Sequence, residues 1–313
     1  MQHFEKFLLL IAMFVLAACG GVSAASPAGN SVNSQSNADP VNQQIVTLSV
    51  TPAPIALPTN AEGISIVARV NGTEITLPDF QRTLTRYEQQ QPDVADASVL
   101  QTSVLNTMIE QVLIEQAAAE RQITVTDEEL DAEIQSNIQL AGSDAAWQEW
   151  LQTNQYTEEE FRETLRDALM TGRVLESVTQ DLHGNVPHVH ARHILVETEA
   201  EATELLNRIG NGEDFATLAA QYSLDETTAR QGGDLGWFTE DELLEPSLAQ
   251  AAFALQPNMV TGPIQTMLGY HIIQTLERDD RPISEDRMPD VMQARFERWV
   301  DSLVAAATIE RYL

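Results

Sequence analysis

Apolar residues recur with two periods along the chain, and each period predicts a different kind of element. Just after residue 61, β-branched residues flank Asn71-Gly72, which is the strongest short signal for a β-hairpin. From there to about residue 182, apolar side chains recur every three or four positions, which predicts mostly helical structure. One such stripe comprises Leu105, Met108, Ile109, Val112 and Leu113.

Several of the predicted helices begin at capping sequences. Thr126 stands three positions before Glu129, which is the spacing of a capping box. Thr157 stands in the same relation to Glu160. In Thr76-Leu77-Pro78-Asp79 the same spacing includes a proline near the first turn, where its missing N–H is harmless. We therefore expect residues 61–185 to form a helical domain.

Residues 187–279 have a mixed pattern. The strand-like segments VHARHILVE and TGPIQTMLGYHIIQTLE enclose helical segments and the glycine-marked turn QGGDLGWF. This order predicts an α+β module inserted between helices. Beyond it, residues 284–313 contain a helical stripe from Phe296 to Ala307. A lone helix cannot bury such a face, so we expect it to pack on the helical domain.

The N-terminal residues resemble an export signal. Lys6 precedes an apolar run of 12 residues from Phe7 to Ala18, and Cys19 follows directly. The run is shorter than the roughly 20 residues that a membrane-spanning helix needs. Leu-Ala-Ala-Cys resembles a bacterial lipobox, which implies a signal peptide over residues 1–18 and a lipid anchor on Cys19. A plain cleaved signal with a coincidental cysteine is the alternative.

Residues 19–60 are rich in Ser, Asn, Gln, Ala, Pro and Thr. Such a segment buries too little apolar surface to offset its chain entropy, so we expect a disordered tether. With its single cysteine the chain has no internal disulfide, and its formal charge of −30 makes nucleic acid an unfavourable partner. The simplest interpretation of that negative charge is a well-solvated protein surface.

A series of short motifs in the mixed module resembles a known family. The motifs occur in the family's order over about 90 residues, so that together they are far more specific than any one alone. They are His190-Ala191-Arg192-His193-Ile194-Leu195-Val196, Asp214-Phe215, Tyr222-Ser223, Gly232-Gly233-Asp234-Leu235-Gly236-Trp237-Phe238, Ala252-Phe253-Ala254-Leu255, Gly262-Pro263-Ile264 and Gly269-Tyr270-His271-Ile272-Ile273. This series resembles a bacterial parvulin, a peptidyl-prolyl cis/trans isomerase.

The resemblance implies a fold and a setting. We expect an α+β chain in which a parvulin domain with a small antiparallel sheet is inserted in a helical domain completed by the C-terminal helix. VNGTEIT and the helices after it are similar to the chaperone region of SurA-like and PrsA-like foldases. The chain is then an extracytoplasmic lipoprotein of a bacterial cell envelope.

By this resemblance, His193 and His271 are the paired central histidines, and Asp225 falls where many bacterial parvulins carry an aspartate. Neutral imidazoles suit a fixed network, because each ring donates from one nitrogen and accepts at the other. The alternatives are two histidines that only organise the core, and an exposed turn carboxylate beside Glu226.

The resemblance also assigns an apolar slot for a proline ring. Its members are Leu235, Phe238, Leu244 and Leu248, with Met259 as a less certain neighbour. Leu248 departs from the phenylalanine usual in the family, so that the slot loses a flat stacking face. Each of these side chains is equally suited to a plain core position.

The substrate expected from these features is an unphosphorylated Xaa-Pro bond in an unfolded or partly folded exported polypeptide. Glu197, Glu199 and Glu201 stand where phosphate-directed parvulins have a basic cluster, so that a phosphate would be repelled. Rotation about an amide breaks no bond, and no cofactor or metal is expected.

Two rival functions remain at the level of sequence. One is a holdase chaperone whose parvulin module grips extended chains with little or no turnover. The other is a metal site, since His183, His188, His190 and His193 lie close in sequence. On a strand, His188 and His190 would share a face and His193 would point the other way, which disfavours a local ligand set.

Overall fold

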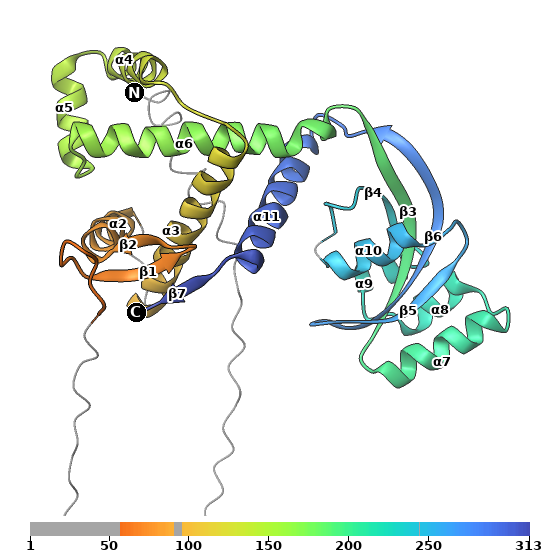
Figure 1. Cartoon of the computed structure of the whole chain (residues 1–313). Helices are drawn as coiled ribbons and strands as arrows, with labels where there is room; N and C mark the ends of the chain where they lie inside the picture. The colour runs from red at the N-terminus through yellow and green to blue at the C-terminus, as the bar shows by residue number, and fades with distance from the viewer. Residues whose placement is uncertain (1–56, 91–95, 244) are drawn as a thin grey trace, which may run out of the picture. The chain divides into compact units, whose positions relative to one another are not determined.

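The structure of the protein is a computed structural model (Figure 1) that describes residues 57–90, 96–243 and 245–313. The predicted signal peptide, Cys19, most of the predicted tether, and Leu244 lie outside the described residues. In this described part of the chain, no helix combines the length and the apolar character needed to cross a membrane.

The chain divides into two compact units. One contains residues up to Met170 together with Val304–Leu313, and the other is Thr171–Leu303. The divisions fall inside helices α6 (Glu158–Thr179) and α11 (Met288–Ala306) rather than at the predicted limits near 185 and 284. Packing of the C-terminal helix on the helical domain stays a prediction.

The first unit opens with the predicted hairpin of β1 (Ile66–Val70) and β2 (Thr73–Thr76). Asn71 and Gly72 have φ values of 50° and 92°, the left-handed pair that a tight hairpin turn of this kind requires. β7 (Ile309–Arg311) pairs antiparallel with the other edge of β1, giving the order β2-β1-β7. This third strand was missed at the level of sequence.

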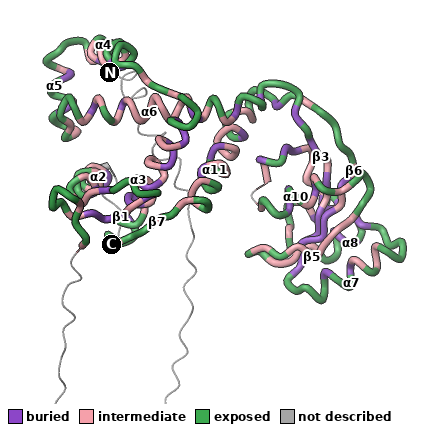
Figure 2. The backbone as a smooth tube through the Cα atoms, in the orientation of Figure 1, coloured by how far each residue is buried: buried purple, intermediate pink, exposed green. Residues whose placement is uncertain are grey.

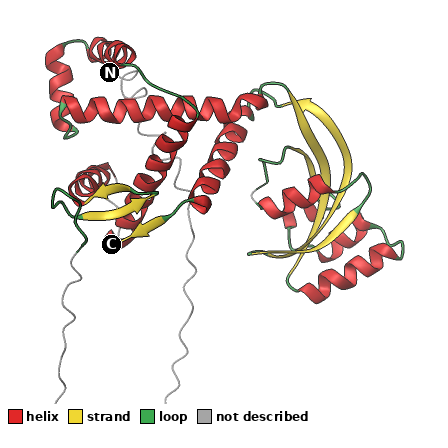
Figure 3. Ribbon diagram, viewed as in Figure 1, coloured by secondary structure: helices red, strands yellow, loops and turns green. Residues whose placement is uncertain are grey.

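Helices make up most of the other described residues of the first unit (Figure 3). They are α2 (Leu77–Gln90), α3 (Ala97–Glu120), α4 (Asp127–Ala141), α5 (Asp144–Thr153) and the first part of α6. The capping boxes predicted at Thr126 and Thr157 are confirmed. The N–H of Glu129 donates to the Thr126 hydroxyl and the N–H of Thr157 donates to the Glu160 carboxylate, each with its reciprocal bond. Leu130, Trp147, Leu151, Phe161 and Leu165 form the buried cluster between α4, α5 and α6.

A half-buried carboxylate on α6 provides a test of this packing. Burial raises the pKa of Asp167 to about 7, and the neighbouring carboxylates of Glu115 and Glu163 add to this effect. Arg166 acts in the opposite direction and offsets only part of the increase. The folded chain therefore holds a proton that the unfolded chain has already released, and the penalty on folding grows as the pH rises from about 4 to 7.

We expect Asp167→Asn to raise the free energy of unfolding at pH 8 by about 1–2 kcal/mol, a value reduced because the side chain is only half-buried. At pH 4 wild type and variant should unfold at the same urea concentration. Glu163→Gln, on the exposed side of the same helix, serves as the control and should give a much smaller gain. An equal midpoint for Asp167→Asn at both pH values would contradict the prediction.

The second unit is built on a four-stranded antiparallel sheet with the order β4-β3-β6-β5. Its strands are β3 (Asn185–Val196), β4 (Asp234–Phe238), β5 (Val260–Thr266) and β6 (Gly269–Pro282). Between them lie the helices α7 (Glu199–Gly210), α8 (Phe215–Tyr222), α9 (Glu226–Ala229) and α10 (Pro246–Ala254). The predicted α+β class is confirmed.

Each face of this sheet packs on its own helices, and the buried residues concentrate along the central strands (Figure 2). Ile194 and Ile272 face α7 and α8, where they join Leu205, Phe215 and Leu218 in one core cluster. The opposite face contributes Val189, Ala191 and Ile273 to a second cluster with Phe238, Leu248 and Ala252. Since side chains alternate along a strand, His193 and His271 point to this second, α10 face.

Candidate active site

Two buried histidines meet across the central strands. His193 on β3 is 5% exposed and His271 on β6 is 2% exposed, and their Nδ1 atoms lie 3.3 Å apart. The two rings are nearly parallel, with an interplanar angle of 21°. One Nδ1 must donate and the other accept, so the pair is held in one defined protonation pattern.

The far nitrogen of each ring continues the network. Nε2 of His193 lies 2.7 Å from Oδ2 of Asp225, and Nε2 of His271 lies 2.9 Å from the hydroxyl of Thr266. An ionised carboxylate only accepts, so Nε2 of His193 carries a proton. In the tautomer with a proton on Nε2 alone, His193 accepts at Nδ1 from His271, whose Nε2 accepts from the Thr266 hydroxyl.

Local structure fixes Asp225 in place. It is the N-cap of α9 and accepts a hydrogen bond from the N–H of Thr227, while the Thr228 hydroxyl donates to its Oδ2 at 2.6 Å. The preceding Leu224 donates its N–H to the carbonyl of Leu195 at 2.7 Å, which ties this loop to the end of β3. With these bonds and a side chain that is 23% exposed, Asp225 differs from the exposed turn carboxylate of the alternative.

The environment lowers the pKa of the group at each end of the network. Burial raises the pKa of the Asp225 carboxyl, but hydrogen bonds from Thr228 and His193 outweigh this effect and lower the pKa to about 2. Burial, reinforced by the neighbouring His193 and partly offset by Asp225, lowers the pKa of His271 to about 4. At neutral pH the network thus contains an ionised Asp225 and a neutral His271.

The lowered pKa of His271 has a consequence for stability. Between pH 6.5 and 4 the unfolded chain binds a proton at His271 that the folded chain does not bind. The contribution of His271 to stability is therefore fully present above pH 6.5 and is lost as the pH falls toward 4. We expect this group to account for about 2 kcal/mol over that interval. In His271→Gln the decline measured by urea unfolding should be less steep than in wild type by this amount, and an identical slope would contradict the prediction.

A glycine lets β4 approach the histidine strand closely. Gly233 has a φ of 82°, and its carbonyl accepts the His193 N–H at 2.8 Å. A Cβ at this position would lie 2.0 Å from the His193 carbonyl oxygen. Only glycine fits this approach.

The residues predicted for the proline slot occupy different places. Phe238 and Leu248 are 3% and 4% exposed and belong to the core cluster on the α10 face, with the half-buried Leu235 packed against it. Met259 is 55% exposed just before β5. Leu244 lies outside the described residues.

Sequence reasoning missed several neighbours of these groups. Leu243 and Ile264 are half-buried and pack against the same apolar cluster, and Thr228 and Thr266 complete the histidine network. The only signal for the two threonines was their closeness in sequence to Asp225 and His271. Nothing in the sequence distinguished Leu243 from Leu244.

Two other histidines of the described residues, His188 and His190, have partners of their own. Nδ1 of His188 lies 2.9 Å from the Val186 carbonyl oxygen, and Nε2 of His190 lies 2.8 Å from Asp234 Oδ1. Across the residues that the structure describes, no three His, Cys, Asp or Glu side chains are grouped so that they could hold a metal ion.

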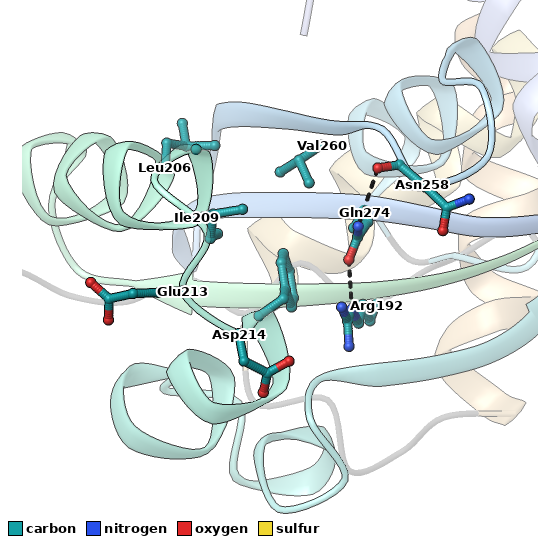
Figure 4. A pocket seen from close by; sticks show the side chains of 10 residues that line it. Arg192, Leu206, Ile209, Glu213, Asp214, Asn258, Val260 and Gln274 are labelled. Carbon is teal, nitrogen blue, oxygen red and sulfur yellow. Dashed lines mark hydrogen bonds between the residues drawn. The ribbon is translucent and has the colours of Figure 1, made fainter.

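A polar pocket lies on the opposite face of the sheet (Figure 4). Arg192 and Gln274, which neighbour each other across β3 and β6, are joined by a hydrogen bond of 2.7 Å at its base. Leu206, Ile209 and Val260 supply its apolar lining. Arg192 and Gln274 alternate with His193 and Ile273 along the two strands, so their side chains lie on the other face of the sheet. The pocket is therefore separate from the histidine network.

Comparison with known proteins agrees with this architecture. Residues 190–277 match the PPIC-type PPIase domain, and residues 45–175 match the SurA-like N-terminal domain. The two matches place a PPIC-type PPIase domain after a SurA-like N-terminal domain.

The relatives give a more particular assignment. The chain is 34% identical over 174 residues to the foldase protein PrsA of Geobacillus sp. (strain WCH70), covering 53% of this chain and 61% of that relative. It is 31% identical over 207 residues to PrsA of Geobacillus kaustophilus, covering 61% of this chain and 72% of the relative. The chain belongs to the PrsA-like foldase family. A crystal structure of PrsA from Bacillus anthracis is similar with a TM-score of 0.44 and 25% identity, covering 64% of this chain and 94% of that one.

Proposed function

We propose that the protein is a peptidyl-prolyl cis/trans isomerase and folding chaperone for exported polypeptides, with His193, His271 and Asp225 at its catalytic centre. The observation that carries this proposal is the hydrogen bond between the two buried histidines, 3.3 Å between Nδ1 atoms, on the sheet face that also bears the Phe238 and Leu248 cluster. Membership of the PrsA-like family supports the same function.

The reaction requires positioning rather than bond chemistry. Amide resonance imposes a barrier of about 18–20 kcal/mol on rotation of an Xaa-Pro bond, and a ten-thousandfold acceleration requires about 5–6 kcal/mol of preferential binding to the twisted amide. In our proposal, neutral imidazoles of fixed tautomer provide the polar side of the site and keep the rotating carbonyl oriented. The apolar cluster provides a dry surface that disfavours the charge-separated planar amide.

The apolar side of the proposed site has an inner and an outer layer. Phe238 and Leu248 are buried, so in our proposal they form the floor. The half-buried Leu235, Leu243 and Ile264 pack against this floor and would contact the proline ring directly. Leu244 and Met259 belong to the proposal on the family resemblance alone.

A protease-coupled peptide assay with the purified full chain tests the function. We expect faster cis/trans exchange of an unphosphorylated Leu-Pro peptide, and slower turnover of a phosphoserine-proline peptide because Glu197 and Glu199 repel phosphate. A holdase would suppress aggregation of an unfolded protein while leaving the exchange rate unchanged. That result would overturn the isomerase proposal and favour the chaperone alternative.

We also propose that a lipid on Cys19 anchors the chain at the extracytoplasmic side of a bacterial membrane, where newly exported clients emerge. The apolar run before Cys19 and the polar segment after it support this location. Two acyl chains hold a protein stably where one is marginal. We expect Cys19→Ser to move the protein from the membrane fraction to the soluble fraction, as measured by cell fractionation. Retention of the variant in the membrane fraction would refute the anchor.

A further inference from the structure

A buried carboxylate lies outside the histidine network, in the loop that joins β4 to α10. The Asp241 side chain is only 1% exposed and is held by two arginines of α11. Arg295 places Nε 2.9 Å from each carboxylate oxygen and Nη2 2.7 Å from Oδ2. Arg298 places Nη1 2.8 Å from Oδ1. A carboxylate this deeply buried depends on such paired donors, because it has no access to water.

The same stretch of chain holds the loop at further points. Arg298 donates from Nη2 to the carbonyl of Glu240 at 2.9 Å. Arg287, just before α11, forms an ion pair of 3.0 Å with Glu242 and donates to the carbonyl of Trp237. Three arginines thus grip residues 237–242 through both side chains and backbone. In a chain with only 17 Lys and Arg residues, this is a large share of the positive charge at one loop.

This loop also carries part of the apolar side of the proposed site. Phe238 stands at its start, and Leu243 stands two positions after Asp241 and packs against the Phe238 and Leu248 cluster. Asp241 and Glu242, the two residues before Leu243, are both paired with arginines, so the backbone that leads into Leu243 is held on this side. Loosening the anchor would let Leu243 move away from the cluster without altering the histidines.

We propose that Asp241 is a positioning residue and that α11 shapes the proline-binding surface through it. This inference rests on the proposed isomerase function. The match to the PPIC-type PPIase domain ends at residue 277, before all three arginines. The isomerase module of this chain then extends beyond the matched domain as far as Arg298. The apolar surface of the module depends on α11, which lies outside the matched residues.

The test compares two aspartates that share one arginine. Asp241→Ala removes the buried anchor, whereas Asp181→Ala removes only the 64% exposed partner of Arg295 and does not touch the loop. In the full chain, we expect Asp241→Ala to raise KM for a Leu-Pro peptide by about fivefold or more while kcat stays within about twofold, as loss of uniform binding predicts. Asp181→Ala should change neither constant.

Hydrogen exchange provides a readout that is independent of turnover. Amides of residues 239–243 should exchange roughly tenfold faster in Asp241→Ala, while those of α7 keep their wild-type rates. Arg298→Gln leaves Arg295 paired with the Asp241 carboxylate, so we expect an intermediate increase in KM and in loop exchange. This variant replaces Asp241→Ala in the test if Asp241→Ala does not fold. If wild type proves inactive, the proposed function fails, and affinity for the same peptide replaces KM as the test of positioning.

A lower melting temperature with unchanged KM or affinity and unchanged loop exchange would overturn the inference, because Asp241 would then contribute only to stability. Faster loop exchange with an unchanged KM or affinity would overturn it as well, since the loop would be anchored without shaping the site.

Discussion

Replacing His193 and His271 together by alanine is expected to lower both isomerase activity and stability. The change leaves Oδ2 of Asp225 and the hydroxyl of Thr266 without their ring partners and opens a cavity between β3 and β6. Losing buried partners of this kind costs about 2–4 kcal/mol of unfolding free energy. Activity should fall by roughly tenfold or more, equivalent to about 1.4 kcal/mol of transition-state stabilisation.

His190→Ala is the matched control for this double variant. His190 lies on the same strand but contacts Asp234 and the Trp237 ring instead of the central network. Its removal should leave peptide turnover within about twofold of wild type. Lost activity with an unchanged melting temperature would refute the structural half of the prediction, and retained activity in the double variant would refute the catalytic half.

Gly233→Ala is expected to be the most destabilising single change in the second unit. The new methyl group would meet the His193 carbonyl oxygen at 2.0 Å, and the φ of 82° is unfavourable for any residue with a Cβ. The backbone conformation costs about 1–2 kcal/mol and the overlap about 1–3 kcal/mol more. We expect a total loss of roughly 3 kcal/mol or more, measured by urea unfolding.

Gly236→Ala separates the two contributions. Gly236 has a φ of 71°, close to that of Gly233, but a Cβ there would meet nothing within 4 Å. Only the backbone cost of about 1–2 kcal/mol should appear. Equal losses for the two variants would show that the contact with the His193 carbonyl contributes nothing.

The local features of the fold could be predicted because their causes are local. Asn71-Gly72 specifies its own turn, and Thr126 with Glu129 specifies a helix start, whatever the rest of the chain does. β7 could not be predicted in this way. Its three residues pair with β1 across more than 230 positions, and so short a segment has no period of its own.

The candidate site could be predicted only as far as the family motifs reached. The motifs named His193, His271 and Asp225, and the structure brings these three together, although their catalytic roles stay predictions. Leu243 and the Asp241 anchor escaped notice, because their importance depends on α11, which is distant in sequence. Met259 matched by position, yet its side chain is exposed.

The pairing of β7 with β1 has a consequence for the order in which the chain assembles. Residues 171–303 precede residues 309–311 in the chain, so during synthesis or export the second unit has all its strands while β1 still has one unpaired edge. Domains fold as units when their residues have emerged, so we expect the later part of the chain to mature first. Until the last residues arrive, the open edge of β1 is a point at which a second nascent copy could pair wrongly.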